Sequence, residues 1–489
     1  MKHFRHDYSC RRNGPQEDVN PPDGPLATNT RVVLRHPLWH PLWHPRWYSL
    51  WHPLRYSLLV QPRATRHTPR MDQDTDLTGH LQRAAHAARA ASHVLAGSSA
   101  ATRDHTLRVM ATALRDNRPE ILAANAEDLA RFEGTNAFRD RLMLNEARVD
   151  AMARGLEEVA ALPDPLGRVL ADWTRPNGLN FRRIATPIGV IGMIYESRPN
   201  VGADASALCL KSGNAVILRG GSDSQHSASA INAALVTGLE AAGLPRACIQ
   251  IPPTADRAYV AAMLAGAGLI DLIIPRGGRS LVERVRRDAR VPVLAHAEGL
   301  CHTYVHAAAD PAMARAIVAN AKMRRTGVCG ATETLLIDSA IAAAQLPGIV
   351  ADLRALGCDF RADTAARRVL PALTAATPAD FDTEWLDAVI SIAVVDGVDG
   401  ALAHIARHGS SHTDAIVTED PIAAERFLAG IDSAVGLWNA STQFCDGGEF
   451  GFGAEIGIAT GRIHARGPVG LEQLTTYRYV IRGTGQVRA

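Results

Sequence analysis

The chain has 489 residues, 47% hydrophobic and 21% charged, a composition typical of globular proteins that excludes disordered and fibrous classes. This length exceeds what one hydrophobic core usually supports, so two or more lobes are expected. The net charge of +2 is uneven, because residues 1–70 hold 11 basic and 4 acidic residues, net +7, whereas the rest holds 41 basic and 46 acidic residues, net −5.

Residues 1–70 contain a short repeat rich in histidine, proline and tryptophan, RHPLWHPLWHPRWYSLWHPLRYSLLV. Its frequent prolines prevent helix propagation. One interpretation is a metal-binding or nucleic-acid-binding tail that uses His36, His40, His44 and His52, although the prolines and the absence of nearby cysteine weaken a metal site. The other is a disordered extension, or a start codon wrongly chosen before Met71. We expect the second, and therefore no nucleic acid partner.

After Met71 the sequence predicts regular secondary structure. Alanine, leucine, arginine and glutamate recur at helical spacing from residue 72 to about 162, which predicts a helical entry region. Strands are then expected in PIGVIGMIY, NAVILRGGS, CIQIP and LIDLIIPRGG, each followed by a helix, at 201–211, 225–242, 257–265 and 279–287. This alternation predicts an α/β fold with a parallel sheet between helices. Apolar runs such as 188–195 are far shorter than the roughly 20 residues of a membrane-spanning helix, so no membrane association is expected.

Two of the predicted strands end in glycine pairs, Arg219-Gly220-Gly221-Ser222 and Arg276-Gly277-Gly278-Arg279. Ligands of parallel sheets bind beyond the carboxyl ends of the strands, where a phosphorylated cofactor would meet arginine charge and free helix N–H groups. The strict GxGxxG fingerprint is absent, so ordinary tight turns explain these glycines equally well. The glycines alone leave a nucleotide site undecided.

Cysteines at positions 10, 209, 248, 301, 329, 358 and 445 form no CxxC pair, which favours a reducing, cytoplasmic setting over a disulfide framework or a metal site. Most cysteines of this kind are small buried hydrophobic residues, as we expect for Cys209 and Cys248. Cys329 differs, because it lies among small residues in RRTGVCGATETLL, just after Arg324 and Arg325. Arginine charge favours a thiolate, and an accessible backbone N–H favours chemistry at a carbonyl.

From Met71 to Ala489 the chain resembles the gamma-glutamyl phosphate reductase family, a branch of the aldehyde dehydrogenase superfamily. The blocks that carry the resemblance are PIGVIGMIYESRPNVGADASALCLKSGNAVILRGG, LIIPRGG, NAKMRRTGVCGATETLLI, HGSSHTDAIVT, VGLWNASTQFCDGGEFGFGAEIGIAT and HARGPVGLEQLTTY. The resemblance implies an aldehyde-dehydrogenase-like α/β fold with a Rossmann-type NADPH-binding domain (71–165 and 188–300) and a catalytic domain (301–472). It also implies a homo-oligomer, assembled through a hairpin and a terminal strand (166–187 and 473–489).

The resemblance further implies NADPH-dependent reduction of L-glutamate 5-phosphate to L-glutamate 5-semialdehyde with phosphate release, and a functional link to glutamate 5-kinase. It assigns the nucleophile to Cys329, whose thiolate attacks the acyl phosphate to form a thioester that a hydride then reduces. It assigns the oxyanion contact to the Cys329 N–H and the Asn200 amide. A helix N-cap is an equal alternative for Asn200. Arg198 is expected at the substrate phosphate or the cofactor.

The remaining site residues also follow from the resemblance. The cofactor would contact Arg219, near a 2′-phosphate, together with Gly220, Gly221, Ser222, Arg276, Gly277 and Gly278. Glu384 would bind the nicotinamide ribose, with an exposed acid at a helix start as the alternative. The substrate candidates are Ser441, Thr442, His464 and Arg466, because arginine is a natural partner for a carboxylate.

Two other functions compete with this one. A hydrolytic aldehyde dehydrogenase acting on a small aldehyde would share the fold, the thiolate and the cofactor, but it needs a glutamate that activates water. Ala297 or Glu298 falls at that position here, and we expect Glu298 to be structural. A non-catalytic protein that binds nucleic acid or metal through residues 1–70 would lose its function without that segment. The intact Cys329 argues against such a protein.

Overall fold

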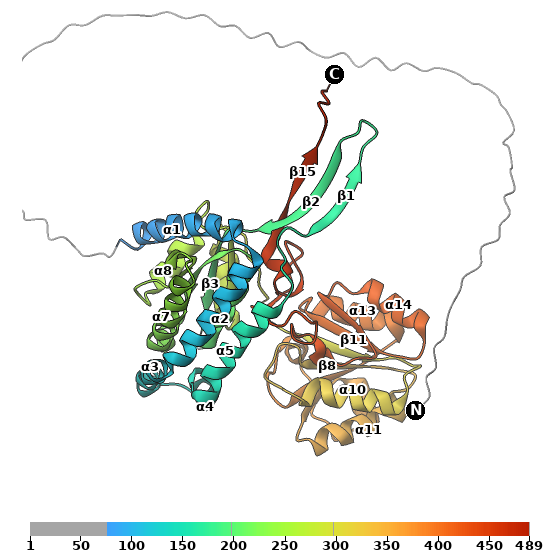
Figure 1. The fold of residues 1–489 in the computed structure, drawn as a ribbon. Helices are drawn as coiled ribbons and strands as arrows, with labels where there is room; N and C mark the ends of the chain where they lie inside the picture. Colours follow the sequence, from blue (N-terminus) through green and yellow to red (C-terminus); the bar gives the residue numbers. More distant parts are fainter. Residues whose placement is uncertain (1–75, 197, 297, 489) are drawn as a thin grey trace, which may run out of the picture. The chain divides into compact units, whose positions relative to one another are not determined.

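The computed structural model describes residues 76–196, 198–296 and 298–488, which belong to one compact unit (Figure 1). The histidine-rich residues 1–70 lie outside the described residues, as does Ala297. Within the described part of the chain, no helix combines the length and the apolar character needed to cross a membrane.

Five helices open the described chain and confirm the predicted helical region: α1 (Leu77–Gly97), α2 (Ala100–Asp116), α3 (Arg118–Arg131), α4 (Asn136–Leu142) and α5 (Glu146–Ala161). Capping side chains fix the starts of four of them, α1, α2, α4 and α5. Asp76 accepts a hydrogen bond from the Gly79 N–H at 2.8 Å, and Ser99 accepts one from the Thr102 N–H at 3.1 Å. The helices bury apolar faces spaced at helical intervals, which is why this composition folds as helix.

The first sheet has four parallel strands in the order β5-β4-β3-β6. These are β3 (Val190–Tyr195), β4 (Ala215–Arg219), β5 (Ile249–Gln250) and β6 (Leu272–Arg276). The connecting helices are α6 (Asn200–Lys211), α7 (Gln225–Ala241), α8 (Arg257–Leu264) and α9 (Arg279–Asp288), with short 3₁₀ turns η1 (Ser222–Ser224) and η2 (Arg246–Cys248). All four helices match their predicted ranges to within one residue at each end, so the predicted alternation is confirmed.

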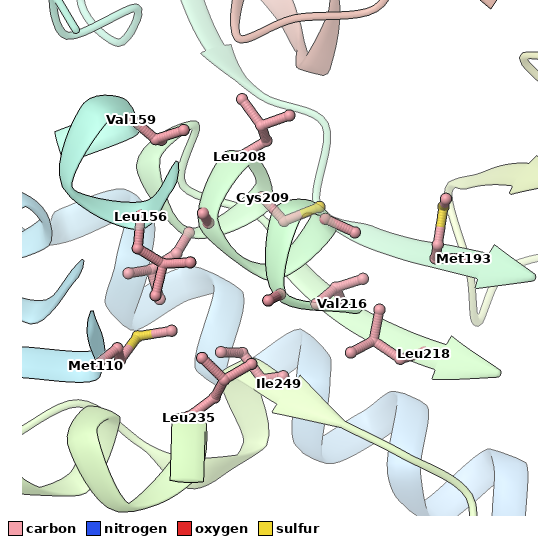
Figure 2. Packing of buried hydrophobic residues seen from close by; sticks show 14 of the residues in the cluster. Met110, Leu156, Val159, Met193, Leu208, Cys209, Val216, Leu218, Leu235 and Ile249 are labelled. Carbon is pink, nitrogen blue, oxygen red and sulfur yellow. The ribbon is translucent and has the colours of Figure 1, made fainter. Parts of the chain in front are cut away.

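Helices cover both faces of the first sheet, which explains why its strands are apolar up to the polar residues at their carboxyl ends. On one face, helices α2, α5, α6 and α7 pack against the strands, as Figure 2 shows for Met110, Leu156, Leu208, Leu235, Val216 and Leu218. On the other face α1, α8 and α9 pack against alternate strand residues such as Val190, Ile217 and Ile273. Cys209 and Cys248 lie in the first of these clusters, as expected of small hydrophobic residues.

The second sheet has six parallel strands in the order β12-β11-β7-β8-β10-β9. Its strands are β7 (Cys301–Val305), β8 (Thr332–Asp338), β9 (Asp359–Ala362), β10 (Val389–Val395), β11 (Thr413–Val417) and β12 (Val435–Trp438). One apolar cluster joins it to α10 (Pro311–Met323), α11 (Ala342–Ala355) and α12 (Thr364–Val369). Another joins it to α13 (Gly397–His408) and α14 (Pro421–Gly430).

A third, antiparallel sheet has the order β1-β2-β15 and contains β1 (Val169–Thr174), β2 (Asn180–Pro187) and β15 (Thr475–Arg482) (Figure 1). The β2 and β15 strands pair within one chain over their whole length, from Thr475 opposite Pro187 to Arg482 opposite Asn180. No described strand pairs with the outer edges of β1 and β15. Large side chains on these strands remain exposed, namely Val169, Trp173, Tyr477, Tyr479 and Ile481.

The chain after β12 returns to the first sheet. The hairpin of β13 (Ile458–Ala459) and β14 (Gly467–Pro468) contributes Ala459 to the cluster that α2, α5, α6 and α7 form with that sheet. Three further 3₁₀ turns, η3 (Pro378–Asp382), η4 (Thr442–Phe444) and η5 (Glu472–Leu474), complete the elements. The α/β fold is thus as predicted, and the domain boundaries proposed at 300 and 472 stay predictions.

Gly238 in α7 allows close contact with α2, because a Cβ at this position would lie 2.6 Å from Met110 Cα. Gly238→Ala should therefore force the two helices apart and destabilise the protein by about 1–3 kcal/mol, a typical cost of overpacking. The measurement is the urea midpoint followed by circular dichroism. Gly97→Ala is the matched control, because nothing lies within 4 Å of a Cβ there. Equal midpoints for the two variants would contradict the prediction.

Candidate active site

Cys329 is half-buried in the turn between α10 and β8, and two glycines let other segments reach this turn. A Cβ at Gly299 would lie only 2.0 Å from the Cys329 carbonyl oxygen, and a Cβ at Gly330 would lie 3.2 Å from the Thr442 carbonyl oxygen. The Cys301 thiol donates to the same Cys329 carbonyl at 3.1 Å. The turn is therefore held through contacts that larger residues at 299 and 330 would disturb.

Burial governs the protonation of Cys329. Desolvation raises the pKa of its thiol to about 12, and Cys445, Glu455 and Glu384 act in the same direction. The thiol is consequently protonated at neutral pH in the free protein. Any chemistry at this sulfur must first remove that proton.

Arg276, at the end of β6, is the neighbouring charge that lowers the pKa of Cys329 most. Its Nη1 donates to the Ile456 carbonyl at 2.8 Å. The sequence pointed instead to Arg324 and Arg325, but both are exposed and neither is among the charges that act most on Cys329, so that expectation is corrected. A second arginine, Arg198, also interacts electrostatically with Cys329, and burial lowers its pKa to about 10, which leaves it charged at neutral pH.

Asn200 is the first residue of α6 rather than its N-cap, which is Pro199, so the capping interpretation is wrong. Its amide donates to Asp204 Oδ2 at 3.1 Å. Burial raises the pKa of Asp204 to about 6, against the opposing effects of Asn200 and Arg276. The bond to Asp204 uses one of the two N–H donors of the amide, and the oxyanion role of Asn200 stays a prediction.

The carboxylates near the nucleophile are engaged by other groups. Glu298 forms an ion pair with Arg279 at 2.8 Å, consistent with the structural role expected for it. Glu384 accepts a hydrogen bond from the Gly299 N–H at 2.9 Å, and burial raises its pKa. It lies half-buried in the loop before β10, so the alternative of an exposed acid at a helix start is wrong.

A buried ion pair anchors the loop that carries Glu384. Lys322 donates to Glu333 at 2.5 Å, and both side chains are almost fully buried. The other oxygen of Glu333 accepts from the Leu386 N–H at 3.3 Å, two residues beyond Glu384. Burial raises the pKa of Glu333 to about 7, although Lys322 opposes this shift. The ion pair between Lys322 and Glu333 thus helps to position Glu384 beside the Cys329 turn.

At the end of β4, Arg219 is buried and its guanidinium donates to the carbonyls of Gly220, at 2.5 Å, and Ala255. Its Nε is buried and has no hydrogen-bond partner in the described structure. Gly220 packs against the Tyr195 ring, which a Cβ would approach to 3.2 Å. Gly221 precedes η1, which begins at Ser222 and leads directly into α7.

At the end of β6, a carboxylate occupies the start of α9. Glu196 accepts a hydrogen bond from the Gly278 N–H at 2.9 Å, and a Cβ at Gly277 would lie 2.4 Å from the same carboxylate. A negative group therefore already stands where a cofactor phosphate was expected. The roles assigned to Arg276, Gly277 and Gly278 in cofactor binding stay predictions.

The four substrate candidates already make hydrogen bonds within the chain. Ser441 accepts from the Gln443 N–H at 3.3 Å, and the buried Thr442 hydroxyl pairs with the Thr332 hydroxyl at 3.0 Å. These two residues lie next to the Cys329 turn, because the Thr442 carbonyl approaches Gly330. Their contact with substrate stays a prediction.

The other two candidates lie in the segment around β14. Arg466 donates to the Asp432 carboxylate at 3.1 Å and to the Asp432 carbonyl at 2.7 Å. His464 pairs with the Gln473 carbonyl at 2.9 Å. A substrate carboxylate would have to compete with Asp432 for Arg466, so this assignment also stays a prediction.

Two histidines beside the nucleophile were not singled out from the sequence. One ring nitrogen of His296, one of His412 and the Cys329 sulfur all lie within 4.8 Å of one another. Burial lowers the pKa of His412 to about 3 and also lowers that of His296, so both rings are neutral at neutral pH. They become neighbours because β7 and β11, the strands that follow them, are adjacent in the sheet. No local pattern signals such a group.

Comparison with known proteins identifies the family. The model of the aldehyde dehydrogenase family matches residues 67–367. A gamma-glutamyl phosphate reductase from Gluconobacter oxydans is 71% identical over 413 residues, which cover 84% of this chain and 97% of that protein. Another from Acidiphilium cryptum is 69% identical, over 83% of this chain and 97% of that protein. The chain belongs to the gamma-glutamyl phosphate reductase family.

The fold agrees with membership of the gamma-glutamyl phosphate reductase family. A crystal structure of the reductase from Thermotoga maritima is 42% identical and covers 84% of this chain and all of that chain, with a TM-score of 0.82. The family and the aldehyde-dehydrogenase-like fold expected from the sequence blocks are therefore confirmed.

Membership of the reductase family implies a nicotinamide cofactor. The end of β4 fits such a group, because its glycine pair keeps side chains away from the strand end and Arg219 brings positive charge with an unpaired donor. The end of β6 fits less well, since Glu196 already accepts from the start of α9.

The pKa of Cys329 predicts how its alkylation depends on pH. Because only the thiolate reacts, iodoacetamide should modify Cys329 slowly at pH 7, and the rate should rise about tenfold per pH unit up to pH 10. Peptide mass spectrometry of the free protein measures this rate, with glutathione alkylated in parallel as a reference thiol. A plateau at or below pH 8 would show that the protein stabilises the thiolate.

Proposed function

We propose that this chain uses NADPH to reduce L-glutamate 5-phosphate to L-glutamate 5-semialdehyde and phosphate, the second step of proline biosynthesis. The observation that carries the proposal is Cys329, held in a turn where the charges of Arg276 and Arg198 act on its sulfur. A thiol is the nucleophile that this chemistry requires, and arginine charge suits an acyl phosphate. The identity of 71% to a gamma-glutamyl phosphate reductase supports the same reaction.

Cys329 carries the covalent steps. Its thiol loses a proton, which solvent or the departing phosphate takes up, and the thiolate attacks the acyl carbon of the substrate. Phosphate leaves with the electrons of the cleaved C–O bond, and a thioester remains. NADPH, when bound, would supply the hydride for reduction of this thioester and would leave as NADP⁺. The thiohemiacetal then breaks its C–S bond, which releases the aldehyde and regenerates the thiolate.

Arginine charge and amide donors assist these steps. Arg276 favours the Cys329 thiolate. We assign Arg198 to the phosphate, whose charge grows as it leaves, because the guanidinium remains charged at neutral pH. The Cys329 N–H and the Asn200 amide are assigned to the oxyanion of the tetrahedral intermediates.

The engaged carboxylates favour a reductase over a hydrolytic aldehyde dehydrogenase. A free general base beside the thioester would activate water and discard the intermediate as an acid. Glu298 pairs with Arg279, and Glu384 accepts from the Gly299 N–H. Glu455, which also acts on the Cys329 sulfur, accepts from the Gly447 N–H at 3.0 Å. With these three carboxylates engaged, reduction of the thioester is favoured over its hydrolysis.

The specific cofactor and the assembly complete the proposal. We assign NADPH to the end of β4, where Arg219 would exchange its bonds to the Gly220 and Ala255 carbonyls for the 2′-phosphate. Glu384 is assigned to the nicotinamide ribose.

The unpaired edges of β1 and β15, with exposed Trp173 and Tyr479, support a homo-oligomer that extends this sheet. An acyl phosphate hydrolyses readily in water. A functional link to glutamate 5-kinase, the enzyme that would supply this substrate, is therefore part of the proposal.

The reverse reaction tests the proposed function. With glutamate 5-semialdehyde and NADP⁺, NADPH formation by the full chain should require inorganic phosphate, because phosphate and not water cleaves the thioester. Absorbance of NADPH, with and without phosphate, measures this requirement. Cys329→Ala is the control and should fold normally but lack turnover. A rate independent of phosphate would favour the hydrolytic dehydrogenase, and retained turnover in the variant would remove Cys329 as nucleophile.

The role of Arg219 is tested by cofactor preference. Arg219→Ala should raise the KM for NADPH about tenfold or more while changing the KM for NADH little, because one charge-assisted contact to the 2′-phosphate is lost. Arg246→Ala is a suitable control, since Arg246 is an exposed arginine near the same sheet with only a 3.9 Å ion pair. Parallel increases in both KM values would assign Arg219 a structural role instead.

A further inference from the structure

We propose that Cys329, His296 and His412 form a binding site for a zinc-like divalent ion that masks the nucleophile. The three residues bring one sulfur and two imidazole nitrogens within 4.8 Å of one another. Thiolate and imidazole are the donors that zinc prefers over hard cations such as magnesium and calcium. The site goes beyond the proposed reduction, which uses no metal.

The two histidines are oriented as metal-binding histidines usually are. His296 Nδ1 pairs with the Ile458 carbonyl at 2.8 Å, and since a carbonyl only accepts, this nitrogen carries the proton. The lone pair of His296 therefore lies on Nε2. Bonds from the second nitrogen to a backbone carbonyl typically orient imidazole ligands in this way.

His412 supplies an independent sign of a missing partner. Its Nδ1 is engaged by the Thr413 hydroxyl at 2.9 Å. Its Nε2 is buried and has no hydrogen-bond partner in the described structure, and the residue is fully buried. Leaving such an atom unpaired is unfavourable, and a metal ion would satisfy it.

The geometry fits a tetrahedral ion after small adjustments. Zinc lies about 2.0–2.1 Å from imidazole nitrogen and about 2.3 Å from sulfur, so the ligand atoms of a tetrahedral site are roughly 3.5 Å apart. The ligand atoms lie up to 4.8 Å apart here, so the separations need to shrink by up to about 1.3 Å, through small rotations of both histidine rings and of the Cys329 side chain. Three protein ligands leave one position for water.

Charges of both signs surround the proposed metal site, so their effects on the binding of a cation oppose one another. Arg276 acts on Cys329 and opposes a cation, but Glu384 and Glu455 act on the same sulfur with the opposite sign. Binding would release the thiol proton to solvent and form the metal–sulfur bond, because a coordinated thiol is deprotonated. The ion would then hold the only sulfur that the proposed reduction uses, and a chelator would restore activity.

Cobalt spectroscopy on the full chain tests the site. Metal-free protein titrated with Co²⁺ should develop a thiolate-to-cobalt charge-transfer band and the visible bands of a tetrahedral ion, saturating at one equivalent. Histidines in residues 1–70 can also take up cobalt, so the thiolate band and not total uptake is the readout. Zn²⁺ should displace Co²⁺, bleach the band and slow alkylation of Cys329.

Variants assign the ligands. Cys329→Ser should remove the band, whereas Cys10→Ser and Cys358→Ser, the latter in the apolar cluster with α11 and α12, should retain it. His296→Ala and His412→Ala should each weaken cobalt binding about tenfold or more, and His86→Ala, an exposed histidine of α1, should not. No thiolate band in the wild-type protein, or a band unaffected by Cys329→Ser or by both histidine variants, would overturn the proposal. The cobalt titration and the zinc displacement use the wild-type protein, so their outcome does not depend on whether any variant folds.

The inhibitory consequence rests on the proposed function, and the two can fail separately. If the cobalt band appears as described but Zn²⁺ leaves turnover unchanged, the metal site stands and Cys329 is not the nucleophile. If Zn²⁺ inhibits without a thiolate band, the metal acts elsewhere.

Discussion

The candidate site depends on one close approach between backbones. Gly299 lies so near the Cys329 carbonyl that no side chain fits between them. Its N–H is held by Glu384, and Cys301, two residues further on, donates to the same carbonyl. Three segments of the chain thus meet around Gly299 and the Cys329 carbonyl: the loop before β7, the turn before β8 and the loop before β10. The position of the sulfur follows from this contact.

Arg276 links this arrangement to the first sheet. It stands at the carboxyl end of β6, donates to the Ile456 carbonyl, and acts electrostatically on Cys329, Arg198 and Asp204. The same strand end that would face a cofactor therefore also sets the charge around the nucleophile. A substitution at Arg276 would alter the pKa values of several groups together, and its effect on any one of them cannot be isolated.

Local patterns predicted the elements well, and distant contacts explain what they missed. The helices after β3, β4 and β6 follow from alternating apolar runs, and the sequence blocks around Cys329 identified the family. From the sequence, the charge near the sulfur was attributed to Arg324 and Arg325, because a motif contains only residues that are close in sequence. Arg276, His296 and His412 reach Cys329 only through strand order, and Arg466 meets Asp432 in the same way. The N-cap alternative for Asn200 was wrong because the helix begins one residue earlier than expected.

The scarcity of lysine has a chemical consequence at the surface. The chain contains only Lys2, Lys211 and Lys322. The two that the structure describes are buried in ion pairs, Lys211 with Asp104 and Lys322 with Glu333. Acyl phosphates acylate primary amines, whereas guanidinium groups, which stay protonated, bind phosphate without attacking the acyl carbon. On the described part of the chain, the proposed substrate therefore meets arginine at the surface and no exposed amine that it could modify.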